Sequence, residues 1–342
     1  MFQRTLRTGL RRGFTVIELL VSIGVISLLI AILMSAVQSA RETSRRMECM
    51  NRMRQIMQAT TAFETNRQRF PEYSCGGEDR QGKRHLSICP LVQILPFIDQ
   101  ANVFQRVDHN EMVGFASGYQ RPSALSAKNM EFMTLTIPIY QCPSDRTLPG
   151  SCNYRANLGS GADWYTFPPA PPFQGCIDPK NGNGAFEMMQ ALSPSRFTDG
   201  LSNTAMFSER VIGDGDPSQY DPWRDYSQVD DAWPHCRAEQ LRSTCRDIAG
   251  IAAQHASFSG FTWFYATKAQ TAYDHISPPN SRIPDCAHDA LSVAGATNSA
   301  IAARSQHPGI VNVAMGDGSI RTVAESIDLE VWRQMGSRNG ND

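Results

Sequence analysis

An uninterrupted apolar run near the amino terminus is the feature that most constrains this chain of 342 residues. Residues 14–37 are nearly all apolar or small, and their one charged side chain is that of Glu18. At a helical rise of about 1.5 Å per residue the run is roughly 36 Å long, which exceeds a hydrocarbon core of about 30 Å. We therefore predict a transmembrane helix over residues 14–37.

The segment before this run is basic, since residues 1–13 carry four arginines and no acidic side chain. A secretory signal peptide also begins this way, but its apolar core of roughly 7–15 residues is followed by a small-residue cleavage site. Here the run is longer, and Gly13 precedes it. We favour a retained anchor. Arginines lie on both sides of the run, so their distribution does not set its orientation.

The junction at residues 12–18 reads RGFTVIE and resembles the type IV prepilin signal. The resemblance implies that residues 1–13 are a leader, which prepilin peptidase removes by cutting after Gly13 at the cytoplasmic face of the bacterial inner membrane. Phe14 would then become the N-methylated amino terminus of a single-pass protein. The remainder, residues 38–342, would be extracytoplasmic, in the periplasm or at the cell surface.

Glu18 is the only carboxylate in the apolar run. A carboxylate within a membrane helix costs roughly 2.5–3.5 kcal/mol on insertion scales, so its presence indicates a function. In a pilus-like filament it would pair with the amino group of Phe14 in a neighbouring subunit, and a mispaired charge would penalise the wrong stacking register. The alternative is a glutamate that snorkels to the membrane interface. We favour the register function.

The helical pattern continues beyond the apolar run. Apolar residues, including Met47, Met53 and Met57, recur at spacings of three and four residues until Pro71 stops the pattern. We predict one helix from residue 14 to about residue 66, with a membrane half over 14–37 and an amphipathic half over 38–66. The methionines are predicted to pack against a sheet and not to bind a metal.

Residues 67–342 are broken into short segments by glycine, proline and asparagine, which is typical of a β-rich domain with long loops. The clearest element lies within residues 307–323. Two β-prone runs, 309–315 and 319–323, flank Asp317 and Gly318 and predict a hairpin. A short closing helix is predicted over 328–335.

Nine residues separate His307 from Asp317-Gly318, and this H-x9-DG pattern carries a second resemblance. The chain resembles a large bacterial family of pilin-like proteins with a prepilin segment at one end and a processing-associated H-x9-DG region at the other. Further blocks similar to that family are 51–59, 93–100, 141–145 with Asn153, and 198–204 with Glu209. The resemblance implies an α+β, pilin-like fold, in which a long amino-terminal helix packs on an antiparallel β-sheet.

Two interpretations of the H-x9-DG residues remain open. His307 and Asp317 could build a ligand-binding or processing site. Alternatively, Asp317 and Gly318 form the turn, and His307 caps the start of the strand by a hydrogen bond. We favour the second interpretation, because a demanding turn geometry also explains why such a motif recurs.

Few other residues suggest chemistry. Asp214, Asp216 and Asp221 offer hard oxygen ligands on a flexible loop and could hold calcium, although a solvated acidic turn is the favoured interpretation. No nucleophile elbow, phosphate-binding loop or zinc-binding helix motif is present, so we expect no enzyme and no other cofactor. With 19% charged residues and a net charge of −1, the chain is not expected to bind nucleic acid.

The chain has nine cysteines, an odd number, and none of them form a Cys-x-x-Cys pair, which disfavours zinc and thioredoxin-type sites. In an oxidising compartment, cysteines close in sequence would pair. We expect Cys49 to be free or to pair between chains. The expected disulfides are Cys75/Cys89, Cys142/Cys152 and Cys236/Cys245.

These observations together predict a pilin-like or pseudopilin-like subunit of a type II secretion or type IV pilus-like filament. Its expected partners are prepilin peptidase, other pilin or pseudopilin subunits, and the lipid of the inner membrane. The alternative is an envelope-anchored module that binds a solute, a polysaccharide or a protein.

Overall fold

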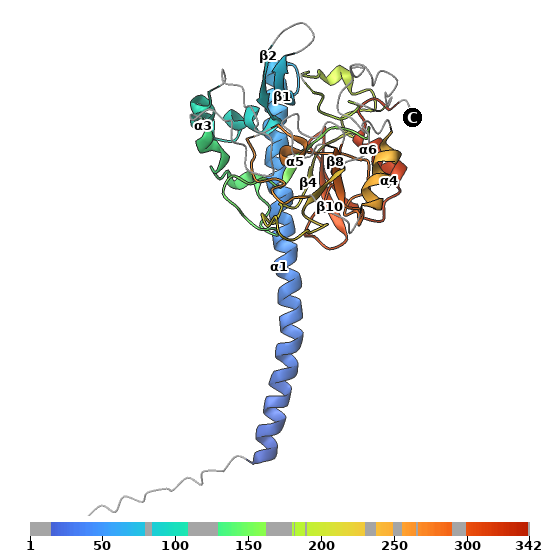
Figure 1. The fold of residues 1–342 in the computed structure, drawn as a ribbon. Helices are drawn as coiled ribbons and strands as arrows, with labels where there is room; N and C mark the ends of the chain where they lie inside the picture. The colour runs from blue at the N-terminus through green and yellow to red at the C-terminus, as the bar shows by residue number, and fades with distance from the viewer. Residues whose placement is uncertain are drawn as a thin grey trace, which may run out of the picture. The chain divides into compact units, whose positions relative to one another are not determined.

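The computed structural model describes most of the chain and shows a mixed α+β fold, as predicted (Figure 1). The described residues are 15–78, 84–108, 129–161, 180, 182–188, 190–229, 237–248, 255–264, 266–288 and 299–340. The chain divides into two compact units, residues 1–45 and 46–342.

The long helix α1 spans Val16–Arg67, close to the predicted range of 14–66. Thr15 and Glu18 form a capping box, in which the backbone N–H of Thr15 donates to Glu18 Oε2 (2.9 Å) and that of Glu18 donates to Thr15 Oγ1 (3.3 Å). The large apolar side chains of residues 16–37 are all 48–73% exposed. This part of α1 is long and apolar enough to cross a membrane.

The carboxyl half of α1 belongs to the second unit and packs into its core. Its fully buried residues are Cys49, Met53, Ile56, Met57, Ala59 and Thr60. The predicted packing role of Met53 and Met57 is therefore confirmed. Met47 is 53% exposed, contrary to the prediction, because two residues correspond to about 200° around a helix and place it opposite Cys49.

The main sheet has five strands in the order β11-β10-β4-β3-β7. All its neighbouring pairs are antiparallel except β3 with β7. The strands are β3 (Tyr154–Asn157), β4 (Ala205–Glu209), β7 (Ala272–Tyr273), β10 (Ile310–Met315) and β11 (Ile320–Ala324). The prediction of an antiparallel sheet under a long helix is confirmed, with one parallel pair added at its edge.

A second sheet has four strands in the order β6-β5-β8-β9, and β1 pairs with β2 in a separate ribbon. These strands are β1 (Ser74–Glu78), β2 (Arg84–Ile88), β5 (Tyr226–Val229), β6 (His255–Ala256), β8 (Asp285–His288) and β9 (Ser299–Ala300). The short helices are α2 (Pro90–Gln93), α3 (Ala101–Arg106), α4 (Ala238–Asp247), α5 (Lys268–Thr271) and α6 (Leu329–Gly336). Single 3₁₀ turns lie at Leu95–Phe97, Met130–Met133, Pro138–Tyr140 and Pro194–Arg196.

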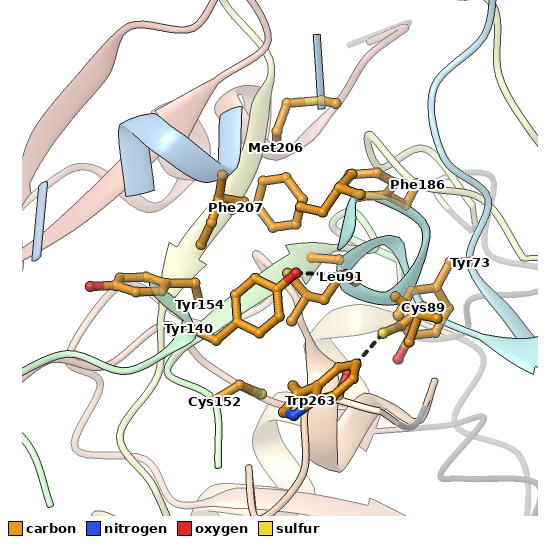
Figure 2. Packing of buried hydrophobic residues seen from close by; sticks show 14 of the residues in the cluster. Tyr73, Cys89, Leu91, Tyr140, Cys152, Tyr154, Phe186, Met206, Phe207 and Trp263 are labelled. Carbon is orange, nitrogen blue, oxygen red and sulfur yellow. Dashed lines mark hydrogen bonds between the residues drawn. The ribbon is translucent and has the colours of Figure 1, made fainter. Parts of the chain in front are cut away.

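The principal core lies where α1 meets the five-stranded sheet and the loops around it (Figure 2). Its polar atoms are satisfied inside the core, as burial requires. The hydroxyl of Tyr140 donates to the carbonyl of Leu91 (2.6 Å), and the Cys89 thiol donates to the carbonyl of Trp263 (3.0 Å). This arrangement fixes the segments around residues 89–91 and 140 against the sheet.

The disulfides differ from every pairing expected from sequence proximity. Cys49 bonds to Cys142 and Cys245 bonds to Cys286, at sequence separations of 93 and 41 residues. Cys89 and Cys152 are free and buried, and burial raises the pKa of each thiol to about 12. The predicted pairing is therefore wrong, because packing of the helix on the sheet brings distant cysteines together. The predictions that fail are a free Cys49 and the pairs Cys75/Cys89, Cys142/Cys152 and Cys236/Cys245.

The carboxyl-terminal hairpin forms where the β-prone runs indicate. Strands β10 and β11 pair antiparallel, with Val311 opposite Val323. In the turn, Asp317 Oδ1 accepts from the backbone N–H and the hydroxyl of Ser319 (2.9 and 2.7 Å), and Gly318 has φ of +88°. Glycine is the residue that adopts this left-handed conformation without steric cost.

Candidate functional site

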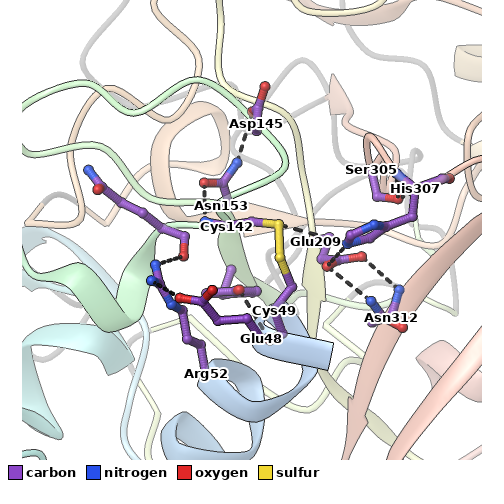
Figure 3. Close-up of a disulfide and its surroundings, with 12 residues drawn as sticks. Glu48, Cys49, Arg52, Cys142, Asp145, Asn153, Glu209, Ser305, His307 and Asn312 are labelled. Carbon is purple, nitrogen blue, oxygen red and sulfur yellow. Dashed lines mark hydrogen bonds and ion pairs between the residues drawn. A yellow bond between two sulfur atoms is a disulfide. The ribbon is translucent and has the colours of Figure 1, made fainter. Parts of the chain in front are cut away.

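Residues from four distant parts of the sequence meet beside the five-stranded sheet (Figure 3). Strand β4 ends at Glu209, β3 begins just after Asn153, and β10 carries Asn312. Since these strands are neighbours in the sheet, their side chains converge. Helix α1 adds Cys49, and the loop before β10 adds His307. The sequence blocks 141–145, 153 and 209 thus lie together with His307.

The Cys49–Cys142 disulfide is at the centre of this cluster and is held on both sides. The hydroxyl of Tyr154 donates to the carbonyl of Cys49 (3.1 Å), and the backbone N–H of Cys142 donates to Asn153 Oδ1 (2.8 Å). Arg52, one turn along α1, donates to the carbonyl of Gln141 (2.7 Å). The segment before Cys142 is therefore attached to α1 by both a covalent bond and hydrogen bonds.

Glu209 is a buried carboxylate with two donors from Asn312. Its Oε2 accepts from the backbone N–H of Asn312 (2.8 Å), and its Oε1 accepts from Asn312 Nδ2 (3.1 Å). The side chains are 2% and 0% exposed. Because a buried carboxylate is costly without hydrogen bonds, this pairing holds the Glu209 side chain in one orientation.

His307 lies between Glu209 and the disulfide. Its Nε2 is 3.3 Å from Glu209 Oε1 and 3.8 Å from Cys142 Sγ. The backbone N–H of His307 donates to Ser305 Oγ (3.0 Å), and its carbonyl accepts from the N–H of Ile310 (3.3 Å). The hydrogen bond at the start of β10 is thus made by the backbone of His307, whereas its imidazole points into the cluster.

The H-x9-DG motif does not form one site. His307 precedes β10 and Asp317 follows its far end, so roughly 20 Å separates them at 3.3 Å per residue. Asp317 and Gly318 form the hairpin turn, and Asp317 engages Ser319. We conclude that His307 and Asp317-Gly318 lie at opposite ends of β10 and do not share a site.

A hydrogen-bond network centred on Asp145 supports the cluster from the side of the 141–145 block. Asp145 Oδ2 accepts from Asn153 Nδ2 (2.9 Å) and from the backbone N–H of Ile212 (2.7 Å). Its Oδ1 lies 2.9 Å from Arg224 Nη1. Asn153 in turn accepts from the N–H of Cys142, so Asp145 positions Cys142 through Asn153.

A fully buried charge triad adjoins the cluster, because Arg210 follows Glu209 and points to the other face of the strand. Arg210 Nη2 lies 2.8 Å from Asp285 Oδ2, and Arg304 Nη2 lies 2.9 Å from Asp285 Oδ1. Burial lowers the pKa of Arg304 to about 10. One carboxylate therefore neutralises part of the charge of two buried guanidinium groups.

The candidate calcium ligands have local partners. Asp214 Oδ1 accepts from the N–H of Asp216 (2.9 Å), and Asp221 Oδ1 accepts from that of Trp223 (2.9 Å). Asp216 Oδ1 accepts from the hydroxyl and N–H of Ser218, and these hydrogen bonds lower its pKa. Within the described residues the three carboxylates do not come together as a ligand set.

A different set does come together in the part of the chain that the structure describes. Four residues each offer one ligand atom, and these atoms all lie within 4.8 Å of one another. We call this set the four-residue group: Cys49, Cys142, Glu209 and His307. No Cys-x-x-Cys spacing indicates it, because its members come from four separate segments. The signal in the sequence that could have indicated this set is that block 141–145, Glu209 and His307 all belong to the blocks similar to one family.

The residues predicted to be processed, Gly13 and Phe14, lie outside the described residues. Glu18 is described, and it belongs to the capping box with Thr15 at the start of α1. Its carboxylate therefore has a structural partner in the same chain.

Comparison with protein families gives one match that covers most of the chain. The model of a family described as a protein of unknown function (DUF1559) matches residues 38–330. Comparisons with curated proteins and with solved structures gave no match. The matched residues include the whole four-residue group.

Proposed function

This chain belongs to the DUF1559 family of proteins of unknown function, and from that premise we propose that it is a membrane-anchored pilin-like or pseudopilin-like subunit. The family match begins at residue 38, where the predicted membrane segment ends. The chain thus consists of an apolar helical segment followed by a β-rich domain of the family. Its function is assembly in a type II secretion or type IV pilus-like filament, and it is not an enzyme.

The exposed apolar surface at the start of α1 is the observation that carries this proposal. Its large apolar side chains over residues 16–37 are 48–73% exposed, far more than a core helix would leave uncovered. Inner-membrane lipid covers them before assembly, and the same segments of neighbouring subunits cover them in the filament. Burial of this apolar area favours both insertion into the membrane and packing in the filament.

Prepilin peptidase is the proposed processing partner, cutting between Gly13 and Phe14. The protein isolated from native membranes then begins at N-methylated Phe14, and its domain lies outside the cytoplasm. The two disulfides among the described residues accord with an oxidising compartment. Intact mass and amino-terminal sequencing test this step, and a mature chain that still begins at Met1 would overturn it.

Glu18 has two separable properties, its negative charge and its acceptor oxygen in the capping box with Thr15. Glutamine also serves at this position of a capping box. Glu18→Gln therefore removes the charge and keeps the cap, whereas Glu18→Ala removes both. Charge pairing between subunits is the property that the register function requires.

We expect Glu18→Gln and Glu18→Ala to reduce incorporation into filaments by at least about tenfold each, because an unpaired amino group in the filament core costs several kcal/mol. The measurement is the ratio of subunit in sheared filaments to subunit in membranes. Thr15→Ser, which keeps the cap and the charge, is the matched control and should assemble normally. Normal assembly of Glu18→Gln would show that Glu18 serves the helix cap alone.

A groove along α1 favours a second candidate function, that of an anchored binding module. The groove has a volume of about 860 Å³ and is lined by amide side chains of α1, including Gln55 and Gln58, opposite Phe97. Amide groups beside an aromatic face suit a polysaccharide, whose hydroxyls need hydrogen bonds and whose ring faces are apolar.

The full chain in detergent should then bind cello-oligosaccharides in isothermal titration calorimetry, with Kd near or below about 1 mM. Gln55→Ala should weaken this binding by about tenfold, because each lost hydrogen bond leaves a polar group unpaired. Gln68→Ala, a glutamine just beyond α1 and outside the groove, is the control. Equal binding by Gln55→Ala and the control would exclude the groove.

A further inference from the structure

The four-residue group contains the donor types that form tetrahedral zinc sites. Zinc is bound by cysteine thiolates, imidazole nitrogen and carboxylate oxygen, most often four in number. Here two sulfurs, one nitrogen and one oxygen lie within 4.8 Å of one another, and all four residues are at most 5% exposed. The four residues come from four separate segments with no local reason to meet, so the packing of α1 on the sheet assembles them.

Two distances between donor atoms are close to the edges of a zinc tetrahedron. With Zn–S of about 2.3 Å and Zn–N and Zn–O of about 2.0–2.1 Å, the S···N edge is about 3.6 Å and the N···O edge about 3.4 Å. The observed separations are 3.8 Å between Cys142 Sγ and His307 Nε2, and 3.3 Å between His307 Nε2 and Glu209 Oε1. The two bonded sulfurs must move apart for the ion to enter, and all the donor atoms already lie within 4.8 Å of one another.

Outer hydrogen bonds already orient the prospective ligands. Asn312 donates twice to Glu209, and Asn153 accepts from the backbone of Cys142. Tyr154 donates to the carbonyl of Cys49. In metal sites such outer partners are as much a part of the site as the ligands themselves. A disulfide alone has no need of a buried carboxylate and an imidazole at its side.

We propose that the four-residue group binds one Zn²⁺ ion when the Cys49–Cys142 disulfide is reduced. A dithiol reductant supplies two electrons and two protons: the S–S bond breaks, two cysteine thiols form, and the reductant becomes a disulfide. Binding of Zn²⁺ releases the two thiol protons to solvent. The site then contains two thiolates, one carboxylate and a neutral imidazole around the ion, with a net charge of −1.

This site gives the protein two ways of holding α1 against the segment that contains Cys142. In the oxidised form the attachment is the covalent bond, and in the reduced form it is the shared ion. Either attachment fixes Cys49 on the same buried face of α1. Its ligands all lie in the unit of residues 46–342, outside the apolar segment on which the proposed filament function rests.

Cobalt titration of the full chain in detergent tests the proposal, since Co²⁺ in a thiolate site gives charge-transfer absorption. After reduction with dithiothreitol and its anaerobic removal, we expect one Co²⁺ per chain with this absorption, displaced by Zn²⁺ with Kd at or below about 1 μM. The oxidised protein should show none. Absence of the absorption in reduced protein that retains its near-ultraviolet circular dichroism would overturn the proposal.

Two sets of variants locate the ion. Cys142→Ser and His307→Ala should each weaken binding by more than about 100-fold, because each removes a direct ligand. The double variant Cys245→Ser/Cys286→Ser removes the other described disulfide and should bind as the wild type does. Binding unaffected by Cys142→Ser, or lost in the double variant, would place the ion elsewhere.

Loss of the folded structure on reduction is a second informative outcome. If the reduced chain loses its near-ultraviolet signal, one equivalent of Zn²⁺ should restore it, because metal binding free energy becomes folding free energy. Failure of Zn²⁺ to restore the signal would contradict the proposal as clearly as failure of the titration.

Discussion

Replacing Asp285 by alanine is expected to lower the free energy of unfolding by about 3–5 kcal/mol, the largest effect of a single substitution that we predict. Asp285 forms ion pairs with Arg210 and Arg304, and the three side chains are at most 2% exposed. Its loss would leave two buried guanidinium groups facing each other. Removing one member of a buried ion pair is costly because the remaining charge can neither be solvated nor find another partner.

The matched control is Asp247→Ala. Asp247 pairs with Arg246 on α4, but the two side chains are 67% and 61% exposed, and such pairs contribute less than about 1 kcal/mol. Urea unfolding of the full chain in detergent, followed by tryptophan fluorescence, compares the two variants with the wild type. An equal decrease in the free energy of unfolding for Asp285→Ala and Asp247→Ala would show that the triad stabilises the fold no more than a surface ion pair does.

Acidification is expected to destabilise the protein through His275. This side chain is fully buried, and burial lowers its pKa from 6.5 to about 3. Between these values the unfolded chain binds a proton that the folded chain does not, so the contribution to stability is complete above pH 6.5 and is lost as the pH falls. From pH 7 to pH 4 this loss amounts to about 3 kcal/mol.

Asp225 has the opposite effect on the pH dependence of stability. Burial raises its pKa from 3.8 to about 6, so the folded state binds the proton more tightly and gains about 2 kcal/mol between pH 7 and pH 4. The wild type therefore shows a partly cancelled pH dependence. His275→Gln should make the protein less sensitive to acid, and Asp225→Asn should make it more sensitive.

Urea unfolding at pH 7 and pH 4 measures both variants, each compared with its own value at pH 7. The intrinsic cost of each substitution cancels in this difference. A wild-type pH dependence retained in full by His275→Gln would contradict the assignment to His275.

The elements that depend on local sequence were predictable. The apolar run and the Pro71 stop predict α1 to within about two residues at either end, because helix formation depends on periodicity and on residues within one turn. The hairpin of β10 and β11 follows from Asp317-Gly318 between two β-prone runs. Both features are decided by interactions between residues close together in the chain.

The cysteine pairing and the four-residue group could not be predicted from local sequence. Sequence proximity suggested Cys142/Cys152, whereas Cys142 bonds to Cys49 on the buried stripe of α1. His307 and Asp317 belong to one motif, yet they lie at opposite ends of β10, and His307 instead meets Glu209. A strand separates residues close in sequence, and a sheet joins residues far apart.

The sequence by itself determined the apolar segment, the single long helix, the carboxyl-terminal hairpin and the short sequence blocks that contain Cys142, Glu209 and His307. Only the tertiary structure decided that the blocks containing Cys142, Glu209 and His307 surround one point beside Cys49. The physical reason is that helix periods and turn conformations are encoded by neighbouring residues. The meeting of four distant ligand atoms depends instead on the order of β10, β4 and β3 in the sheet and on the rotation of α1 against it.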